Sequence, residues 1–169
     1  MCVGYFVWDI YVCIAEGWGA AYIVHGVTCG FVFLGGLHPF LGHMGCVCTL
    51  FEASTVFMHL RRFAIDLRWT KLRPGIVVEL SQAFALVFFV VRIAIGMPAS
   101  AMWWVTMVGN MQSGVAHSVP VYMAYLASNV VMNGLNAYWF FLIIQQGLKA
   151  RNAKGKMEDA AAAVDEKQA

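Results

Sequence analysis

The stretch from Leu50 to Arg73, LFEASTVFMHLRRFAIDLRWTKLR, joins an apolar segment to the densest basic cluster of the chain. Its apolar half carries a single acid, Glu52, and its second half holds five basic residues. These are Arg61, Arg62, Arg68, Lys71 and Arg73. An apolar run followed by Lys and Arg residues is typical of a membrane helix that ends at the cytosolic surface. The stretch therefore predicts a membrane boundary and places an acid inside a predicted span.

Charged residues are scarce and unevenly spread. Of the 169 residues, 61% are hydrophobic and 12% are charged, whereas soluble domains are usually about 45–50% apolar and about 25% charged. No Asp, Glu, Lys or Arg occurs from Gly17 to Phe51, or from Ile93 to Leu148. Each interval exceeds one hydrocarbon crossing of about 20 residues. The composition predicts an all-α, polytopic transmembrane helical bundle and argues against a water-soluble domain.

Apolar runs separated by turn-forming or charged residues predict five transmembrane helices. They cover about residues 1–15, 17–37, 41–60, 76–95 and 119–148. The pair Arg61-Arg62 is expected to mark the end of the third span. Gly96 and Pro98 are expected to end the fourth, because proline interrupts a helix. Residues 99–118 begin apolar and become polar, so a short helix, a re-entrant segment and a sixth span all stay open.

Two basic clusters fix the predicted orientation in the membrane. The first covers residues 61–73, and the second contains Lys149, Arg151, Lys154 and Lys156. Both should face the cytosol by the positive-inside rule, which requires an even number of crossings between them. Five spans satisfy this condition and place the C-terminus in the cytosol. A sixth span at residues 99–118 would put the clusters on opposite sides.

The two ends of the chain carry further expectations. The first apolar run starts at residue 1 without flanking residues, so we expect the first helices of the domain to be missing. Residues 149–169 are charged and rich in alanine, and such a composition offers little apolar surface to bury. We therefore expect a membrane domain at 1–148 and a cytosolic tail at 149–169 that is disordered or weakly helical.

Ionisable side chains inside the first two predicted spans are candidates for function, because charge at membrane depth costs a few kcal/mol. His25 lies in the middle of the second span, with Thr28 at i+3. A neutral histidine can take up a proton near neutral pH, and Thr28 is placed to orient it. A satisfied packing histidine is the alternative. Asp9, in the first span, is either a structural hydrogen-bonded acid or a catalytic one.

The third and fourth predicted spans carry a second polar group. Glu52, Thr55 and His59 lie at i, i+3 and i+7 on one helix face. An acid near a histidine can form a proton-transfer pair, or the three side chains can hydrogen-bond between helices and fix the bundle. Arg92 lies near the end of the fourth span. It either extends to the membrane interface or pairs with Asp9 or Glu52.

The last predicted span carries a stripe of amides. Asn129, Asn133 and Asn136 lie at i, i+4 and i+7, where they either join helices or contact a ligand. The sequence contains no phosphate-binding glycine loop, HExxH motif or nucleophile elbow. The cysteines are interpreted as buried thiols, and no metal site is predicted. Basic residues only flank the membrane segments, so nucleic-acid binding is not expected.

Four segments in this order resemble the TLC domain family, which includes translocation-associated membrane proteins and ceramide synthases. GYFVWDIYV (Gly4–Val12) is similar to the family's Gly-Tyr-Phe-x-x-Asp opening, and YIVHGVTCG (Tyr22–Gly30) resembles its His-bearing helix. FEASTVFMHLRRF (Phe51–Phe63) resembles its Glu-x-Ser-Thr-Pro-Phe-x-x-x-Arg segment, with Val56 in place of proline. FFVVRIAIGMP and the Asn-bearing helix resemble its closing half. The resemblance covers about residues 1–148 and is closest to fungal members.

This resemblance implies a protein of the endoplasmic reticulum, a helical bundle around a lipid-accessible cavity, and a role in lipid metabolism or membrane lipid homeostasis. In ceramide synthases a histidine pair on the matching helix transfers an acyl group from acyl-CoA. Here Gly26 follows His25, and the Asp-rich ceramide synthase motif is not recognisable. Both departures argue against ceramide synthesis.

Three functions therefore stay open. The first is a lipid- or acyl-chain-binding protein without catalysis. Its cavity or polar stripe would use Thr28, Thr55, Arg92, Asn129, Asn133 and Asn136. The second is an acyltransferase with acyl-CoA as a possible substrate, His25 as general base, and Asp9 or Glu52 orienting it. The third is a protein-trafficking or structural subunit. No cofactor is expected, and the expected partners are membrane lipids and other subunits in a homo- or hetero-oligomer.

Overall fold

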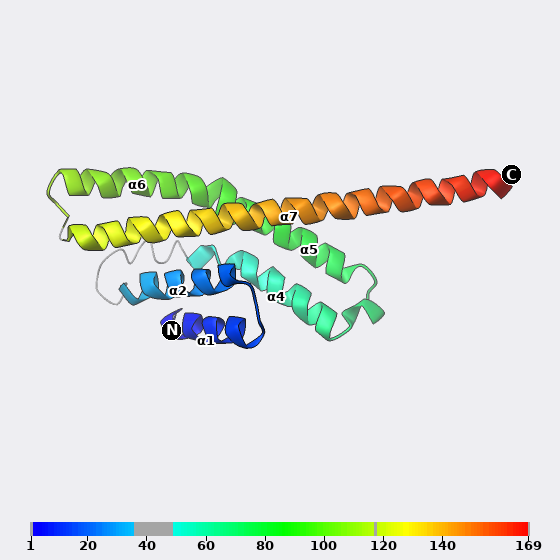
Figure 1. The fold of residues 1–169 in the computed structure, drawn as a ribbon, viewed down its shortest axis with the longest axis horizontal. Coiled ribbons are helices and arrows are strands. Elements are labelled where there is room, and N and C mark those ends of the chain that lie inside the picture. The colour runs from blue at the N-terminus through cyan, green and yellow to red at the C-terminus, as the bar shows by residue number, and fades with distance from the viewer. Residues whose placement is uncertain (1, 36–48, 117, 169) are drawn as a thin grey trace. The chain divides into compact units, whose positions relative to one another are not determined.

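The computed structural model describes residues 2–35, 49–116 and 118–168, and these residues form helices and short turns without any strand (Figure 1). The helices are α1 (Cys2–Ala15), α2 (Ala20–Gly35), α4 (Ala53–Asp66), α5 (Ile76–Phe88), α6 (Met97–Gln112) and α7 (Val119–Gln168). A 3-10 turn covers Trp69–Lys71, and a π-helical segment covers Phe89–Gly96. The chain divides into two units, Met1–Asn136 and Ala137–Ala169. The all-helical prediction is confirmed for the described residues.

Helices α1 and α2 form a close antiparallel pair at the start of the first unit (Figure 1). The turn between them needs Gly17, whose φ is +66°. The N–H of Gly17 donates to the Ile14 carbonyl (3.3 Å), and that of Trp18 donates to the Cys13 carbonyl (2.8 Å). This is the Schellman arrangement, which caps a helix with a left-handed residue. A glycine adopts that conformation at little cost.

Helix α4 continues past the basic pair that was expected to mark the end of the third span. It reaches Asp66, one turn beyond Arg61 and Arg62. The reason is that arginine is a good helix former and marks a membrane boundary without breaking the helix. Arg62 pairs with Asp66 at 3.1 Å, and Arg61 donates to Ser81 of α5 at 2.8 Å. Residues 41–48, where the third span was predicted to start, lie outside the described residues.

Helices α5 and α6 join through the π-helical segment into one helix of 37 residues, Ile76–Gln112. The prediction that Gly96 and Pro98 end the fourth helix is therefore wrong. Pro98 follows directly after the π-helical segment, and such local π adjustments allow a membrane helix to continue through a proline. Gly96 gives room to the Phe51 ring, since a Cβ atom there would lie 3.1 Å from Cε1. No reversal of direction separates residues 95 and 99.

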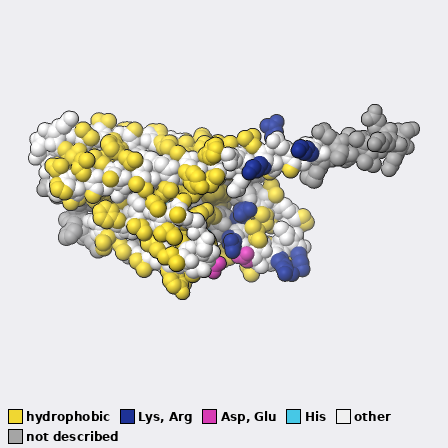
Figure 2. All heavy atoms as spheres, viewed as in Figure 1, with side chains coloured by type: hydrophobic (Ala, Val, Ile, Leu, Met, Phe, Trp, Pro, Cys, Tyr) yellow, Lys and Arg dark blue, Asp and Glu magenta, His cyan; other side chains and the backbone are white. Residues whose placement is uncertain are grey.

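Two helices of the described residues are long and apolar enough to cross a membrane: Ile76–Gln112 and Val119–Ala153. Val3–Ala15 and Ala20–Gly35 are shorter apolar helices. Figure 2 shows hydrophobic side chains over most of the visible surface of the first unit, as expected for helices that face lipid. These features agree with a polytopic bundle, and the count of five spans stays a prediction.

The core between α6 and α7 is built from Met107, Tyr122, Tyr125 and Leu126. Tyr125 also reaches α2, where its hydroxyl donates to the Val32 carbonyl at 3.0 Å. Gly35 makes this contact possible, because a Cβ atom there would overlap the tyrosine hydroxyl. The first part of α7 is thereby tied to both α6 and α2.

The second unit, Ala137–Ala169, is formed by the later part of α7. The tail was expected to be disordered or weakly helical, and in the structure helix continues through Gln168. Alanine, glutamate and lysine are good helix formers, which accounts for a helix without a packed core.

Candidate functional site

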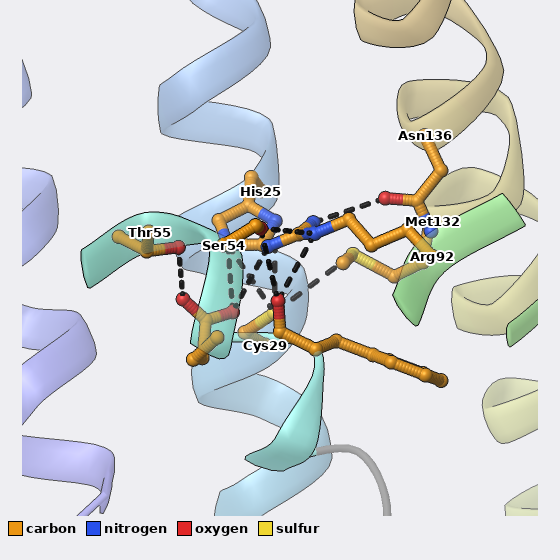
Figure 3. Close-up of polar contacts among 9 residues, drawn as sticks. His25, Cys29, Ser54, Thr55, Arg92, Met132 and Asn136 are labelled. Carbon is orange, nitrogen blue, oxygen red and sulfur yellow. Dashed lines mark hydrogen bonds and ion pairs between the residues drawn. The ribbon is translucent and has the colours of Figure 1, made fainter. Parts of the chain in front are cut away.

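Arg92 is the centre of a buried polar cluster, which also contains His25, Cys29, Glu52 and Asn136. It comes from the π-helical segment, and only 4% of its side chain is exposed. Nη1 donates to Asn136 Oδ1 (3.0 Å), Nη2 lies 3.4 Å from Glu52 Oε1, and Nε donates to the Phe51 carbonyl (3.1 Å) and to Ser54 Oγ (3.3 Å). Figure 3 shows His25, Arg92 and Asn136 pointing toward one another. Arg92 therefore pairs with Glu52 inside the bundle and does not extend to the interface.

Glu52 connects three helices through its carboxylate. Oε1 faces Arg92 and also lies 3.7 Å from Nε2 of His25, while Oε2 accepts a hydrogen bond from Thr55 Oγ1 at 2.8 Å. The Glu52 side chain is 26% exposed, against 10% for His25. Among the described residues, His59 forms no ion pair. The acid–histidine pair thus forms between α2 and the start of α4, and Glu52 is its accessible member.

His25 lies between this carboxylate and a pair of sulfur atoms. Its Nδ1 and Nε2 are 3.8 Å and 3.9 Å from Cys29 Sγ, and that thiol is 3.8 Å from Met132 Sδ on α7. The Phe6 ring packs edge-on at 6.3 Å between centroids. Thr28, which was expected to orient His25, makes no side-chain hydrogen bond within the described residues. Glu52 and Cys29, instead of Thr28, are the polar side chains within 4 Å of the imidazole nitrogens.

Asp9 and Gly26 lie on the other side of the His25 turn. A Cβ atom on Gly26 would be 3.5 Å from Asp9 Oδ2 and only 2.8 Å from Ile10 Cγ1. Among the described residues, Asp9 makes no hydrogen bond or ion pair. Of the two acids considered as partners of His25, Glu52 is the one in contact. A side chain at Gly26 would therefore require Ile10 to shift.

The other two stripe amides form a separate cluster between α6 and α7. Asn129 Oδ1 accepts hydrogen bonds from Ser100 Oγ (2.7 Å), Trp104 Nε1 (2.8 Å) and Asn133 Nδ2 (2.9 Å). Asn133 Nδ2 also donates to Ser100 Oγ at 2.7 Å. This closed set joins two helices, whereas Asn136, on the same stripe, belongs to the Arg92 cluster.

Three residues of these clusters were not predicted from the sequence: Ser54, Ser100 and Met132. The role of Trp104 as a hydrogen-bond donor was not predicted either. Ser54 could have been found from its position two residues after Glu52. Glu52 precedes the first turn of α4, so the helical spacing of three or four residues does not decide which neighbours lie beside it. Ser100 and Trp104 carried no comparable signal. Their role depends on which helix packs against α6.

The Arg92 cluster can hold the Glu52 carboxylate in place, where it can accept a hydrogen bond from a polar group of a ligand. The His25–Glu52 separation of 3.7 Å is longer than a hydrogen bond, although catalytic contacts often shorten only when a substrate binds. No group of three His, Cys, Asp or Glu side chains among the described residues could hold a metal ion. The available chemistry is therefore proton transfer and hydrogen bonding by His25, Glu52 and Thr55.

Comparison with known proteins places this chain in a family. The TLC domain family matches residues 1–145. An uncharacterized TLC domain-containing protein of Saccharomyces cerevisiae is 28% identical over 166 residues, covering 93% of this chain and 50% of that protein. A second one, from Schizosaccharomyces pombe, is 26% identical over 140 residues, covering 80% and 46%.

Topoisomerase I damage affected protein 4 of Saccharomyces cerevisiae is 29% identical over 150 residues, covering 84% of this chain and 52% of that protein. The chain thus spans about half the length of these curated relatives. No solved structure gives a significant match. The family match extends over most of the chain, including the helices that carry His25, Glu52 and Arg92, and the chain belongs to the TLC domain family.

Proposed function

We propose that this chain acts in membrane lipid metabolism or lipid homeostasis, as a multi-pass protein that binds a lipid or an acyl chain among its helices. The observation that carries the proposal is the partly exposed Glu52, held between Arg92 and His25 within otherwise apolar helices. Ionisable groups at membrane depth are costly and usually serve function. With this role we also propose a location in the endoplasmic reticulum and a cytosolic C-terminus.

The Arg92 cluster suggests how the polar part of a lipid would be held. The three guanidinium nitrogens already have partners on Glu52, Asn136 and the start of α4. Arg92 therefore supports the site, and Glu52 with Thr55 is the pair that meets the ligand. A lipid hydroxyl or amine would donate to the Glu52 carboxylate, while its chains lie against the apolar helix surfaces.

An acyl-CoA-dependent acyltransferase is the second candidate, favoured by the contact between His25 and Glu52. In that case Glu52 would orient the imidazole, and His25 would take the proton of an attacking hydroxyl or amine. The acyl thioester bond would break as the new ester or amide bond forms, and the proton would leave with the CoA thiol. The third candidate, a trafficking or structural subunit, would need the polar clusters only for assembly.

Lipid mass spectrometry on cells that lack the protein tests the proposal. Cells would be rescued by wild type, by Glu52→Gln, by His25→Ala, or by Glu16→Gln as a matched acid-to-amide control at an exposed position. Wild type and Glu16→Gln are expected to restore an altered lipid class, and Glu52→Gln is expected to fail at equal expression. Rescue by Glu52→Gln would disprove the role of this site.

The His25→Ala variant separates the first two candidates. If it restores the lipid class, binding suffices and acyl transfer by His25 is excluded. If it fails while its protein level matches wild type, the acyltransferase gains support. If wild type itself changes no lipid class, the structural or trafficking candidate replaces both.

A further inference from the structure

The turn between α4 and α5, residues 67–75, contains basic side chains that the protein does not use internally. The basic residues beside it are occupied: Arg62 pairs with Asp66 (3.1 Å), and Arg73 pairs with Glu79 (2.7 Å). Among the described residues, the side chains of Arg68 and Lys71 have no hydrogen-bond or ion-pair partner. Both are exposed. Two positive charges are thus left to face a partner outside the chain.

Apolar side chains in the same turn are exposed as well. Leu67 and Leu72 are 63% and 85% exposed, and they directly precede Arg68 and follow Lys71. Exposed leucines beside basic residues are typical of segments that lie in a membrane interface, with the leucines in the acyl boundary and the cations among the headgroups.

The position of the turn along the chain agrees with this placement. The apolar helix Ile76–Gln112, long enough to cross a membrane, starts three residues after Arg73. The turn therefore lies at the N-terminal end of a helix that is long and apolar enough to cross a membrane. In Figure 2, Lys and Arg side chains gather near the end of the first unit where α4 and α5 meet.

Arg68 also has an unfavourable backbone conformation. Its φ of +54° and ψ of +39° are left-handed, a region that glycine adopts at much lower cost. The turn geometry alone would favour glycine here. The turn geometry therefore does not explain why residue 68 is an arginine.

We propose that the turn of residues 67–75 is a binding surface for anionic lipid headgroups, with Arg68 and Lys71 contacting headgroup phosphates and Leu67 and Leu72 entering the interface. A guanidinium binds phosphate oxygens through two parallel hydrogen bonds, and an ammonium adds a point charge. This surface is separate from the Arg92 cluster, and the inference does not depend on the proposed function.

The test measures lipid retention by the purified full chain in detergent, using native mass spectrometry with phosphatidylserine or phosphatidylcholine added. The test variant is Arg68→Gly with Lys71→Gln. It should fold at least as well as wild type because glycine relieves the left-handed conformation. Thermal unfolding checks this directly. We expect wild type to prefer phosphatidylserine, and each substitution to weaken that binding about fivefold, so that the pair weakens it about 25-fold.

Arg62→Gln is the matched control, because it removes one charge of the same region that is already paired with Asp66. Its effect should stay within about twofold, since exposed pairs contribute little. Leu72→Ser should weaken retention of both lipids. The proposal is overturned if wild type shows no preference for phosphatidylserine, or if Arg62→Gln loses as much as the test variant. It is also overturned if inorganic phosphate competes fully while Leu72→Ser has no effect, since the site would then bind free phosphate.

Discussion

Replacing Arg92 by methionine should destabilise the protein strongly, because it removes one partner of a buried ion pair. The loss leaves the Glu52 carboxylate without its arginine, with His25 and Thr55 still beside it, and it takes the donor from Asn136 Oδ1. The Phe51 carbonyl keeps a hydrogen bond from Ser54 Oγ. Breaking a buried pair in this way costs about 3–5 kcal/mol. Glu52 is 26% exposed, which places the ionic part near the lower limit, and the orphaned Asn136 oxygen adds about 1 kcal/mol. We therefore expect a total of about 3–5 kcal/mol.

The assay is reversible unfolding in mixed detergent–dodecyl sulfate micelles, followed by circular dichroism. The double variant Glu52→Gln with Arg92→Met should recover about 2 kcal/mol relative to the sum of the single variants, because no unpaired charge remains. Arg62→Met is the matched control at an exposed pair, and its cost should stay below about 1 kcal/mol. An Arg92→Met cost no larger than this control, or additive single effects, would refute the pairing.

Three further predictions concern packing and turns, each measured by the same unfolding assay. Gly26→Ala should cost about 1–3 kcal/mol of unfolding free energy by overpacking against Ile10. Combining it with Ile10→Ala should remove part of that overpacking. A neutral Gly26→Ala would contradict the close approach of Ile10 to Gly26. Asn129→Leu should cost about 1–2 kcal/mol by leaving three donors without their acceptor, and no loss would show that these hydrogen bonds are dispensable. Gly17→Ala should cost about 1 kcal/mol because of its left-handed φ, whereas Gly19→Ala, in open space, should be nearly neutral; equal effects would exclude the capping explanation.

The helical class and the family were predictable because they depend on sequence features that can be read without knowing the tertiary structure. Long charge-free intervals require helices whose backbone groups are satisfied internally, and the ordered motifs from Gly4 to Phe63 identified the family. The pairing of Arg92 was partly predictable as well. A buried cation needs an anion, and Glu52 was one of only two acids proposed for it.

The remaining features depend on which helices touch. Thr28, Asp9 and Glu52 were all predicted as residues that could orient His25, and the contact with Glu52 requires α2 to lie beside the start of α4. The effect of Pro98 depended on a π-helical segment that apolar periodicity does not reveal. Ser100 gains its role only from the opposing face of α7, and a serine in an apolar helix gives no such signal by itself.

The π-helical segment also sets the directions of the side chains on either side of it. Arg92 and Ser100 are eight positions apart, so in an unbroken α-helix of about 3.6 residues per turn they would point about 80° apart. Their partners on α7, Asn136 and Asn129, are seven positions apart, which returns to within about 20° of one direction. A wide turn accommodates one extra residue, so the eight-residue spacing acts as seven and both side chains meet one face of α7. Without this wide turn the same eight residues would form regular α-helix, and one of the two clusters would be rotated by about 100° away from its partner.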